Sequence, residues 1–253
     1  MERLILIETS TALCSAALAE DGIIRSYRES SAPKAHASLT AVFIQEMLAE
    51  KGLTIADCDA VCVSMGPGSY TGLRVGVSTA KGLCFGSGKP LIAVGTLDTL
   101  VAQAPSVIPS EVEGSAFRYI IPMIDARRME VYSAVFEVAG QAGNDGNAAG
   151  NDGDAAGNDV RQITETAPAI IDETSFADYL EQGKCLFIGD GAGKCADVIK
   201  HPNATFVQCW PNAAAMLKPA TQAYKEKRFE DVAYFEPFYL KEFVATVSKK
   251  KMW

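Results

Sequence analysis

The sequence of 253 residues predicts an α/β fold in two lobes. Short apolar runs typical of buried strands alternate with longer helical segments, and this alternation occurs before residue 105 and again after it. A glycine-rich turn leads from a strand into a helix in each half. Because 48% of the residues are apolar, the chain can build a substantial core in both lobes.

The first half is predicted to begin with three antiparallel strands, because Asp21-Gly22 between two strand-like runs is a strong hairpin signal. Thr96 is the predicted N-cap of the last helix, since Ser and Thr side chains satisfy free N–H groups at helix starts. The order is therefore βββαβαβα. The expected elements are strands at Leu4–Ile7, Ser15–Ala19, Ile23–Arg28, Ala60–Met65 and Leu91–Val94, and helices at Ala37–Lys51, Thr71–Phe85 and Leu97–Ala104.

The second half repeats the alternation of strands and helices. Pro122 has no N–H group, so its strand is expected at a sheet edge or at a bulge. Pro219 is expected to break or kink the last helical stretch. The expected elements are strands at Tyr119–Asp125, Glu130–Glu137, Ala169–Ile171, Cys185–Ile188 and Phe206–Cys209, and helices at Ser175–Gln182, from Gly193 to near Lys200, and at Ala213–Lys227; Pro237–Leu240 is expected to be extended.

The predicted division is a first lobe of residues 1–105, a second lobe of residues 106–240 and a flexible tail at 241–253. Residues 143–159 form an insertion in which a seven-residue Gly-Asn-Asp repeat contains no large apolar side chain. Such a segment cannot offset its ordering entropy by burial, which predicts a disordered surface loop. A calcium-binding β-roll is the alternative, but its repeat of about nine residues and its aliphatic residue are both missing here.

Composition restricts the function classes. With a net charge of −8 and a pI of about 4.9, the chain is not expected to bind nucleic acid strongly by itself, so a partner would supply the basic surface. Lys249–Lys251 is interpreted as a solvated tail.

The seven scattered cysteines contain no C-x-x-C pair and indicate reduced thiols. No stretch approaches the ~18 apolar residues of a membrane span, and the first apolar run is too short for a signal peptide. A cytoplasmic protein is expected.

Two glycine-rich turns and one polar strand end are candidate phosphate sites, because free N–H groups at a helix start attract anions. An acidic residue at the strand end could hold a metal–nucleotide complex through water. The alternative is that the polar residues merely end a strand and that the glycines let backbones approach closely. The sequence has no Walker A motif. The candidate residues are Glu8, Thr9, Ser10, Gly66, Gly68, Ser69, Thr71, Arg74, Gly189 and Gly191.

Two helices of the first half have more apolar or small-residue surface than one lobe is expected to cover. Helix 37–51 is apolar on nearly all sides, which is typical of a helix covered on more than one side. On helix 71–85 small residues recur every four positions, and such a ridge permits close helix packing. We therefore expect a partner protein on these helices. The candidate interface residues are Leu39, Val42, Phe43, Met47, Gly72, Val75, Gly76, Thr79, Ala80 and Leu83.

No catalytic or metal-binding residue is predicted. His36 and His201 are the only histidines, and neither has a partner at metal-ligand spacing. His36 is interpreted as a structural or interface residue. A nucleophile elbow of the G-x-S-x-G type is also missing.

Several motifs in order resemble the TsaB (YeaZ) family. They are Ile7-Glu8-Thr9-Ser10, His36, Gly66-Pro67-Gly68-Ser69-Tyr70-Thr71-Gly72-Leu73-Arg74-Val75-Gly76, Gly95-Thr96-Leu97, Asp125-Ala126-Arg127 with Glu130-Val131-Tyr132, and Gly189-Asp190-Gly191-Ala192. The resemblance implies an actin-like ATPase (ASKHA, ribonuclease H-like) fold in two lobes. The Gly-Asn-Asp repeat is a departure from the family pattern.

The resemblance also implies a role in making threonylcarbamoyladenosine at position 37 of tRNAs that read ANN codons. A TsaD-like subunit would carry the catalytic metal site, and a TsaE-like ATPase would join the complex. TsaB-like chains meet TsaD through the helices that correspond to 37–51 and 71–85. The resemblance implies that the chain has no cofactor of its own and that ATP or ADP binds at the partner interface. The isolated chain is expected to form a homodimer, since large apolar patches rarely stay exposed, and to meet tRNA only through the complex.

Three hypotheses follow. The first is a non-catalytic scaffold that completes a catalytic partner. The second is a nucleotide-binding ATPase or small-molecule kinase of the actin-like superfamily, motivated by the polar and glycine-rich turns. The third is a peptidase, an activity sometimes ascribed to the family, for which no nucleophile, base and orienting group occur at recognisable spacing.

Overall fold

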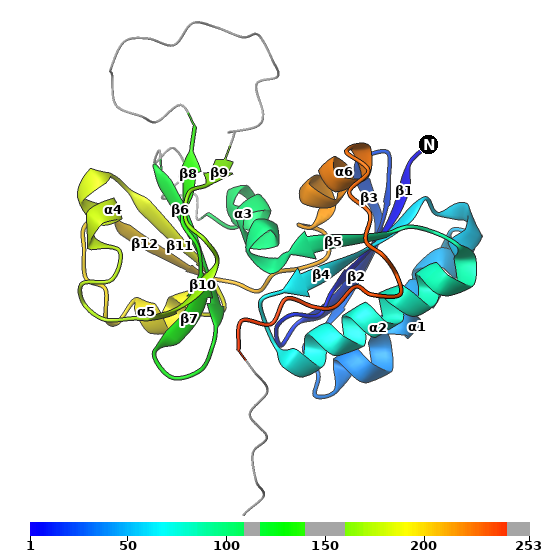
Figure 1. Cartoon of the computed structure of the whole chain (residues 1–253), viewed down its shortest axis with the longest axis horizontal. Helices are drawn as coiled ribbons and strands as arrows, with labels where there is room; N and C mark the ends of the chain where they lie inside the picture. The colour runs from blue at the N-terminus through cyan, green and yellow to red at the C-terminus, as the bar shows by residue number, and fades with distance from the viewer. Residues whose placement is uncertain (109–116, 140–159, 242–253) are drawn as a thin grey trace, which may run out of the picture.

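The computed structural model describes residues 1–108, 117–139 and 160–241. They form two mixed sheets that stand side by side as two lobes (Figure 1). The predicted loop at 143–159 and the predicted tail beyond residue 241 lie outside the described residues. The first lobe contains β1 (Arg3–Glu8), β2 (Cys14–Glu20), β3 (Ile23–Ser30), α1 (Ala35–Glu50), η1 (Ile55–Asp57), β4 (Ala60–Gly66), α2 (Tyr70–Ser87) and β5 (Leu91–Gly95).

The first sheet has the order β3-β2-β1-β4-β5, in which β1, β2 and β3 pair antiparallel and β4 and β5 join in parallel. Strand β1 is central and is buried on both faces, which explains its uninterrupted apolar run. Ile5 and Ile7 contact the core beneath α1 and α2, whereas Leu4 and Leu6 face the opposite core. This alternation follows from the two-residue period of a strand.

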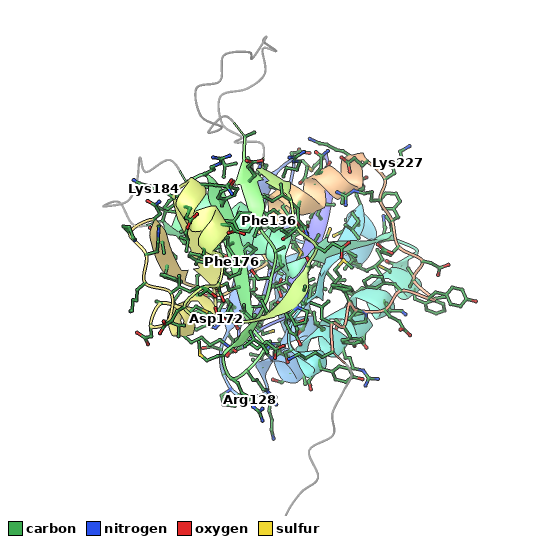
Figure 2. The ribbon with its side chains drawn as sticks, turned by 60° about the vertical axis from the view of Figure 1, so that its left-hand side comes forward. Arg128, Phe136, Asp172, Phe176, Lys184 and Lys227 are labelled. Carbon is green, nitrogen blue, oxygen red and sulfur yellow. The ribbon has the colours of Figure 1, made fainter. Side chains whose placement is uncertain are left out.

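The second sheet has the order β10-β7-β6-β11-β12, with β8 paired to β6 and to β9. Its central strand pairs antiparallel with β7 and parallel with β11, so the strand arrangement of the first lobe is repeated. Arg128 lies at the tip of the β6–β7 hairpin (Figure 2). The elements are α3 (Thr96–Val107), β6 (Tyr119–Asp125), β7 (Glu130–Ser133), β8 (Phe136–Val138), β9 (Val160–Gln162), β10 (Ala167–Ile170), α4 (Ala177–Gln182), β11 (Cys185–Gly189), α5 (Ala192–Cys195), β12 (Ala204–Gln208) and α6 (Leu217–Lys225).

The two lobes exchange their last helices. Helix α3 follows the first sheet but places Leu97, Leu100 and Ala104 in the core of the second lobe. Helix α6 follows the second sheet but packs Ala220 and Ala223 against the first. The predicted division therefore needs correction at both ends, because residues 96–107 pack into the second lobe and residues 213–238 return to the first. Apolar stripes on these helices decide the packing, and chain order does not.

Residues 229–241 cross the first lobe and then reach the second. Glu230 N–H donates to the Leu91 carbonyl at 2.9 Å, and Phe238 N–H donates to the Met65 carbonyl at 2.7 Å. Lys241 then forms an ion pair with Glu130 of the second lobe. The predicted extended segment at 237–240 is present as irregular chain.

Strand β6 lies in the centre of the sheet, so of the two alternatives predicted for Pro122 the sheet edge is wrong. The predicted strand 130–137 is divided into β7 and β8, and the break between them falls opposite Pro122 in the register. The missing N–H therefore lies where the antiparallel ladder is already interrupted. The Ser133 hydroxyl donates to the Pro122 carbonyl at 2.8 Å and helps to close this gap.

Three helix predictions also need correction. Gly95 is the N-cap of α3, and Thr96 is already helical with no capping bond from its side chain. Pro219 lies in the first turn of α6, where a missing N–H costs little, so it marks the start of a shorter helix. Helix α5 contains only four residues and ends at Cys195, before the predicted end near Lys200. No helix within the described ranges is long and apolar enough to cross a membrane.

Candidate functional site

Helices α1 and α2 cover one face of the first sheet and pack against each other (Figure 1). Phe43 and Met47 of α1 and Ala80 of α2 are buried in the core of their own lobe, so they are not partner-facing as predicted. Leu39 and Leu83 are partly buried against the same core. The all-round apolar pattern of α1 is explained by contacts with both the sheet and α2.

Gly72 and Gly76 have an internal neighbour, which corrects their assignment to a partner interface. A Cβ atom at Gly72 would overlap the Thr9 carbonyl oxygen, and one at Gly76 would overlap the Thr9 hydroxyl. These glycines therefore let α2 approach the end of β1. Two residues of the ridge therefore face a strand end, while Ala80 lies in the core cluster that also contains α1.

A different side of α2 remains uncovered. Phe85 is 87% exposed, although the sequence prediction omitted it. Gly82 and Gly86 have open space where a side chain would be, and Val75 and Thr79 are half-buried. We call Val75, Ser78, Thr79, Gly82, Phe85 and Gly86 the outer face of α2. Its helical spacing of small residues around one aromatic ring was the available signal. On α1, the predicted residue Val42 is 39% exposed.

Polar groups gather where β1 ends. Glu8, Thr9 and Ser10 are fully buried, and the Ser10 N–H donates to Glu8 Oε1 at 2.7 Å. Burial raises the pKa of Glu8, while the hydrogen bond from the Ser10 N–H partly opposes that rise. Within the described residues, several buried oxygens of this strand-end cluster have no hydrogen-bond partner. They are Glu8 Oε2, Thr9 Oγ1, Ser10 Oγ, Thr11 Oγ1, Ser64 Oγ and Thr96 Oγ1.

The turn at residues 66–72 covers this cluster. Ser69 N–H donates to the Ser10 carbonyl at 2.6 Å, and a Cβ at Gly68 would lie 2.8 Å from Ser10 Cβ. Gly66 is covered in turn by the Phe238 carbonyl, 2.8 Å from its Cβ position. The structure thus brings together two predicted parts of a phosphate site, the strand end at residues 8–10 and the turn at residues 66–72. The two segments pack directly on each other and occupy the space that a phosphate would need. Close backbone approach is the role that this geometry gives to the glycines.

The side chains at the start of α2 point to local roles. The Ser69 hydroxyl accepts the Gly72 N–H at 3.3 Å and so caps the helix. Arg74 is exposed, and its guanidinium donates to the Tyr70 hydroxyl at 3.2 Å. The Tyr70 ring also contacts that of Tyr239, with 4.7 Å between centroids. Thr71 is exposed beside them.

The second glycine turn, at 189–193, lies in the second lobe and is built in the same way. Gly189 has a φ of +133°, and Gly191 N–H donates to the Met123 carbonyl at 3.0 Å. Asp190 Oδ1 accepts the Asp125 N–H at 2.8 Å. Burial raises the pKa of Asp190 to about 6. These bonds hold the turn against β6 and leave the predicted phosphate contacts of Gly189 and Gly191 as a hypothesis.

His36 has a structural contact, since its Nε2 lies 2.8 Å from the Thr11 carbonyl. Across the part of the chain that the structure describes, no group of three or more His, Cys, Asp or Glu side chains could hold a metal ion.

The repeated strand order and the exchanged helices define the actin-like ATPase class of folds. Two solved structures agree with this arrangement. A Pseudomonas aeruginosa protein described as similar to peptidase YeaZ has a TM-score of 0.75 and 23% identity, and YeaZ from Pseudomonas aeruginosa has a TM-score of 0.71 and 22% identity. Each comparison covers 95% of this chain and 100% of the other.

The family is shown by sequence. The model for TsaD, tRNA N6-adenosine threonylcarbamoyltransferase, matches residues 29–249. The TsaB protein of Escherichia coli, a tRNA threonylcarbamoyladenosine biosynthesis protein, is 30% identical over 248 residues, which is 96% of each chain. The chain therefore belongs to the TsaB family.

Proposed function

We propose that this chain is the non-catalytic scaffold subunit of the complex that transfers a threonylcarbamoyl group to N6 of adenosine 37 in tRNAs reading ANN codons. Membership of the TsaB family supports the pathway. The outer face of α2 supports the scaffold role, because Phe85, which is 87% exposed, lies on the same side of the helix as the half-buried Val75 and Thr79 and two open glycines. Such a contiguous apolar and small-residue surface is typical of an interaction site. A buried aromatic anchor surrounded by small residues is typical of the centre of a protein interface.

The proposed partner on this face is a TsaD-like catalytic subunit. Val75, Thr79 and Gly82 are small enough to let a helix of that subunit lie close to α2, and Phe85 would fill a pocket on it. The same face would pair with a second copy when the chain is isolated. A TsaE-like ATPase would join the assembly, tRNA would be met through the complex, and the setting would be the cytoplasm.

No intrinsic nucleotide site is part of this proposal; ATP or ADP would bind, if at all, at the partner interface. The support is that the chain's own atoms occupy the space around the strand-end cluster, with Ser69 and Gly68 packed on Ser10. The alternative function, a nucleotide-binding ATPase or small-molecule kinase, keeps one observation in its favour. The strand-end cluster contains a buried carboxylate and hydroxyls without partners, and such oxygens call for water or a ligand.

Phe85→Glu is the test, with Ile170→Glu as its matched control. Ile170 is 78% exposed on β10 of the other lobe, so both changes place a charge on an exposed apolar position. We expect Phe85→Glu to weaken binding of the TsaD-like subunit at least about 100-fold, or 2.7 kcal/mol, in calorimetry. Ile170→Glu should bind normally. Equal binding by both variants would remove the outer face of α2 as the interface. Gly76 is unsuitable for this test, because a side chain there would disturb the lobe itself.

A further inference from the structure

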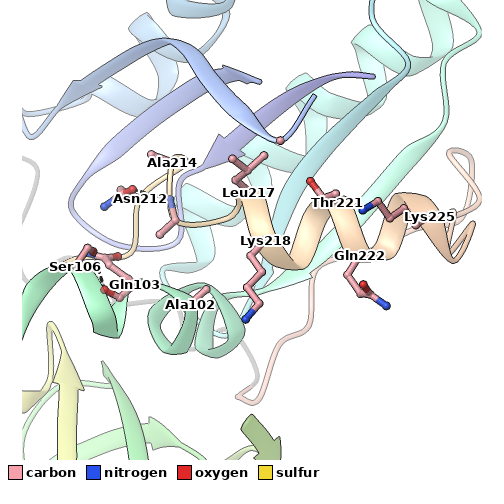
Figure 3. A pocket seen from close by; sticks show the side chains of 12 residues that line it. Ala102, Gln103, Ser106, Asn212, Ala214, Leu217, Lys218, Thr221, Gln222 and Lys225 are labelled. Atoms are coloured by element: carbon pink, nitrogen blue, oxygen red, sulfur yellow. Dashed lines mark hydrogen bonds between the residues drawn. The ribbon is translucent and has the colours of Figure 1, made fainter. Parts of the chain in front are cut away.

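A cavity of about 670 Å³ lies between α3 and α6, the two exchanged helices (Figure 3). Its walls are formed by α3, the segment before α6, one side of α6 and the β2–β3 turn. The residues of α3, that segment and the turn are Ala102, Gln103, Ser106, Asn212, Ala214, Ala215 and Gly22. This volume is within the range of small-molecule sites. The cavity is separate from the strand-end cluster and from the outer face of α2.

The charge of this cavity is opposite to that of the whole chain. Lys218 and Lys225 of α6 line it, and none of the described Asp or Glu residues does, although the chain has 31 acidic and 23 basic residues. Neither ammonium group takes part in an ion pair within the described ranges. The nearby carboxylate of Glu226 is engaged by Arg228 and Gln222. Two lysine charges thus face a cavity in which no described carboxylate forms an ion pair with them.

Polar groups on the walls also lack partners. Thr221 Oγ1 and Gln103 Oε1 are enclosed and have no hydrogen bond to any described residue. Gln103 is only 5% exposed, and its Nε2 donates to the Trp210 carbonyl at 3.1 Å, so its orientation is fixed. Asn212 Oδ1 accepts the Ala215 N–H at 3.0 Å, which leaves its Nδ2 group to donate. The Thr221 hydroxyl can donate to an anion, whereas the Gln103 amide oxygen can only accept and is left to water by a phosphate ligand.

The spacing of the donors indicates the size of the ligand. Lys218 and Lys225 are seven residues apart, which is about 10 Å along a helix. Figure 3 shows Lys218 extending from α6 toward α3, while Lys225 and Thr221 lie close together on α6. Lysine binds phosphate as a flexible point charge, so two of them can hold both ends of a compact polyanion. We propose that this cavity binds a small polyphosphate through Lys218, Lys225, Thr221 and Asn212.

The test measures binding of pyrophosphate and tripolyphosphate to the full chain by calorimetry at low and physiological salt. Lys218→Ala/Lys225→Ala should weaken binding about tenfold or more. The control Lys51→Ala/Lys200→Ala removes the same charge from two exposed lysines elsewhere and should bind within about twofold of the parent. Lys218 and Lys225 are exposed, and unchanged thermal unfolding would confirm that both double variants fold.

Two further arms identify the ligand. Thr221→Val, which removes the hydroxyl while keeping the shape, should reduce affinity by a few-fold. Nucleic acid is the other source of phosphate groups, so a short single-stranded RNA is tested as well. It should bind no better than pyrophosphate. The proposal fails if neither polyphosphate binds, if both double variants lose affinity equally, or if only RNA binds. This outcome is independent of the Phe85→Glu result, so either proposal can fail alone.

Discussion

The two lobes have one strand order but very different helices. In the first lobe α1 and α2 contain 16 and 18 residues, whereas their counterparts in the second lobe, α4 and α5, contain 6 and 4. The short helices cover their sheet and end. The long helices cover theirs and continue to present a second side, which includes Phe85. The comparison teaches that exposed apolar surface in this molecule follows helix length and not the strand order that both sheets share.

The two lobes also share one packing feature, a close contact between glycines and the central strand. In each, a glycine-rich segment follows the strand that pairs in parallel with the central strand, and it packs against the end of the central strand. Gly72 faces the Thr9 carbonyl, and Gly189 and Gly191 face the Met123 carbonyl. The carboxylates at the two strand ends differ, since Glu8 is buried and Asp125 is exposed and paired with Lys194. Shared glycines therefore reflect shared backbone geometry, while the surrounding charges differ.

The largest expected effect comes from adding a methyl group where backbones touch. Gly72→Ala should lower the free energy of unfolding by about 3 kcal/mol, because the new Cβ meets a backbone oxygen that cannot rotate away. Gly193→Ala in the second lobe is the counterpart, because its Cβ would meet the flexible end of Gln208 at 2.7 Å. It should change stability by less than about 1 kcal/mol. Urea unfolding measures both. A mild Gly72→Ala would contradict the close approach of α2 to β1.

The next largest effect is a pH dependence of the free energy of unfolding, which arises in the second lobe. The pKa of Asp190 is raised from 3.8 to about 6, chiefly by burial, so its stabilising contribution is complete below pH 4 and is lost as the pH rises through 6. Asp190→Asn, which still accepts the Asp125 N–H, removes this loss. Relative to the parent, the variant should gain about 2 kcal/mol between pH 4 and 7, allowing for partial exposure. Urea unfolding at four pH values would show it.

Glu181→Gln is the control for this series, since Glu181 is an exposed carboxylate on α4 of the same lobe. Its unfolding curve should follow that of the parent across the pH range. If Asp190→Asn behaves in the same way, the turn at residues 189–193 does not bury a charge.

The smallest effect concerns the outer face of α2. Gly82 lies inside the helix with nothing within 4 Å of its Cβ position, so Gly82→Ala should stabilise the isolated chain by about 1 kcal/mol. Thermal unfolding measures the gain, and Ser78→Ala on the same face should give a smaller one. Binding of the TsaD-like subunit should weaken if a helix lies against Gly82. A stabilised variant that binds as before would place the partner elsewhere on this face.

Particular elements show how far the sequence could be followed. The Asp21-Gly22 hairpin, the run at Leu4–Ile7 and the strand-to-helix turns are local signals, and each is confirmed within a few residues. Helix α6 was predicted in the wrong lobe, because its apolar stripe fits either sheet until both sheets exist. The interface was predicted partly on Phe43 and Met47, which are buried internally, while the exposed Phe85 was missed. An apolar pattern shows that a residue is covered but not what covers it.

The sequence by itself determined the element order of the first lobe, the family and the glycines that close approach requires. In the second lobe it missed β9 and the break between β7 and β8. These properties depend on local preferences and on motifs that are contiguous in the chain. Only the tertiary structure decided which side of α2 is free, where the lobes exchange helices, and that Lys218 and Lys225 face one cavity with Gln103. The physical reason is that exposure and pockets arise from contacts between segments far apart in sequence, which no local pattern records.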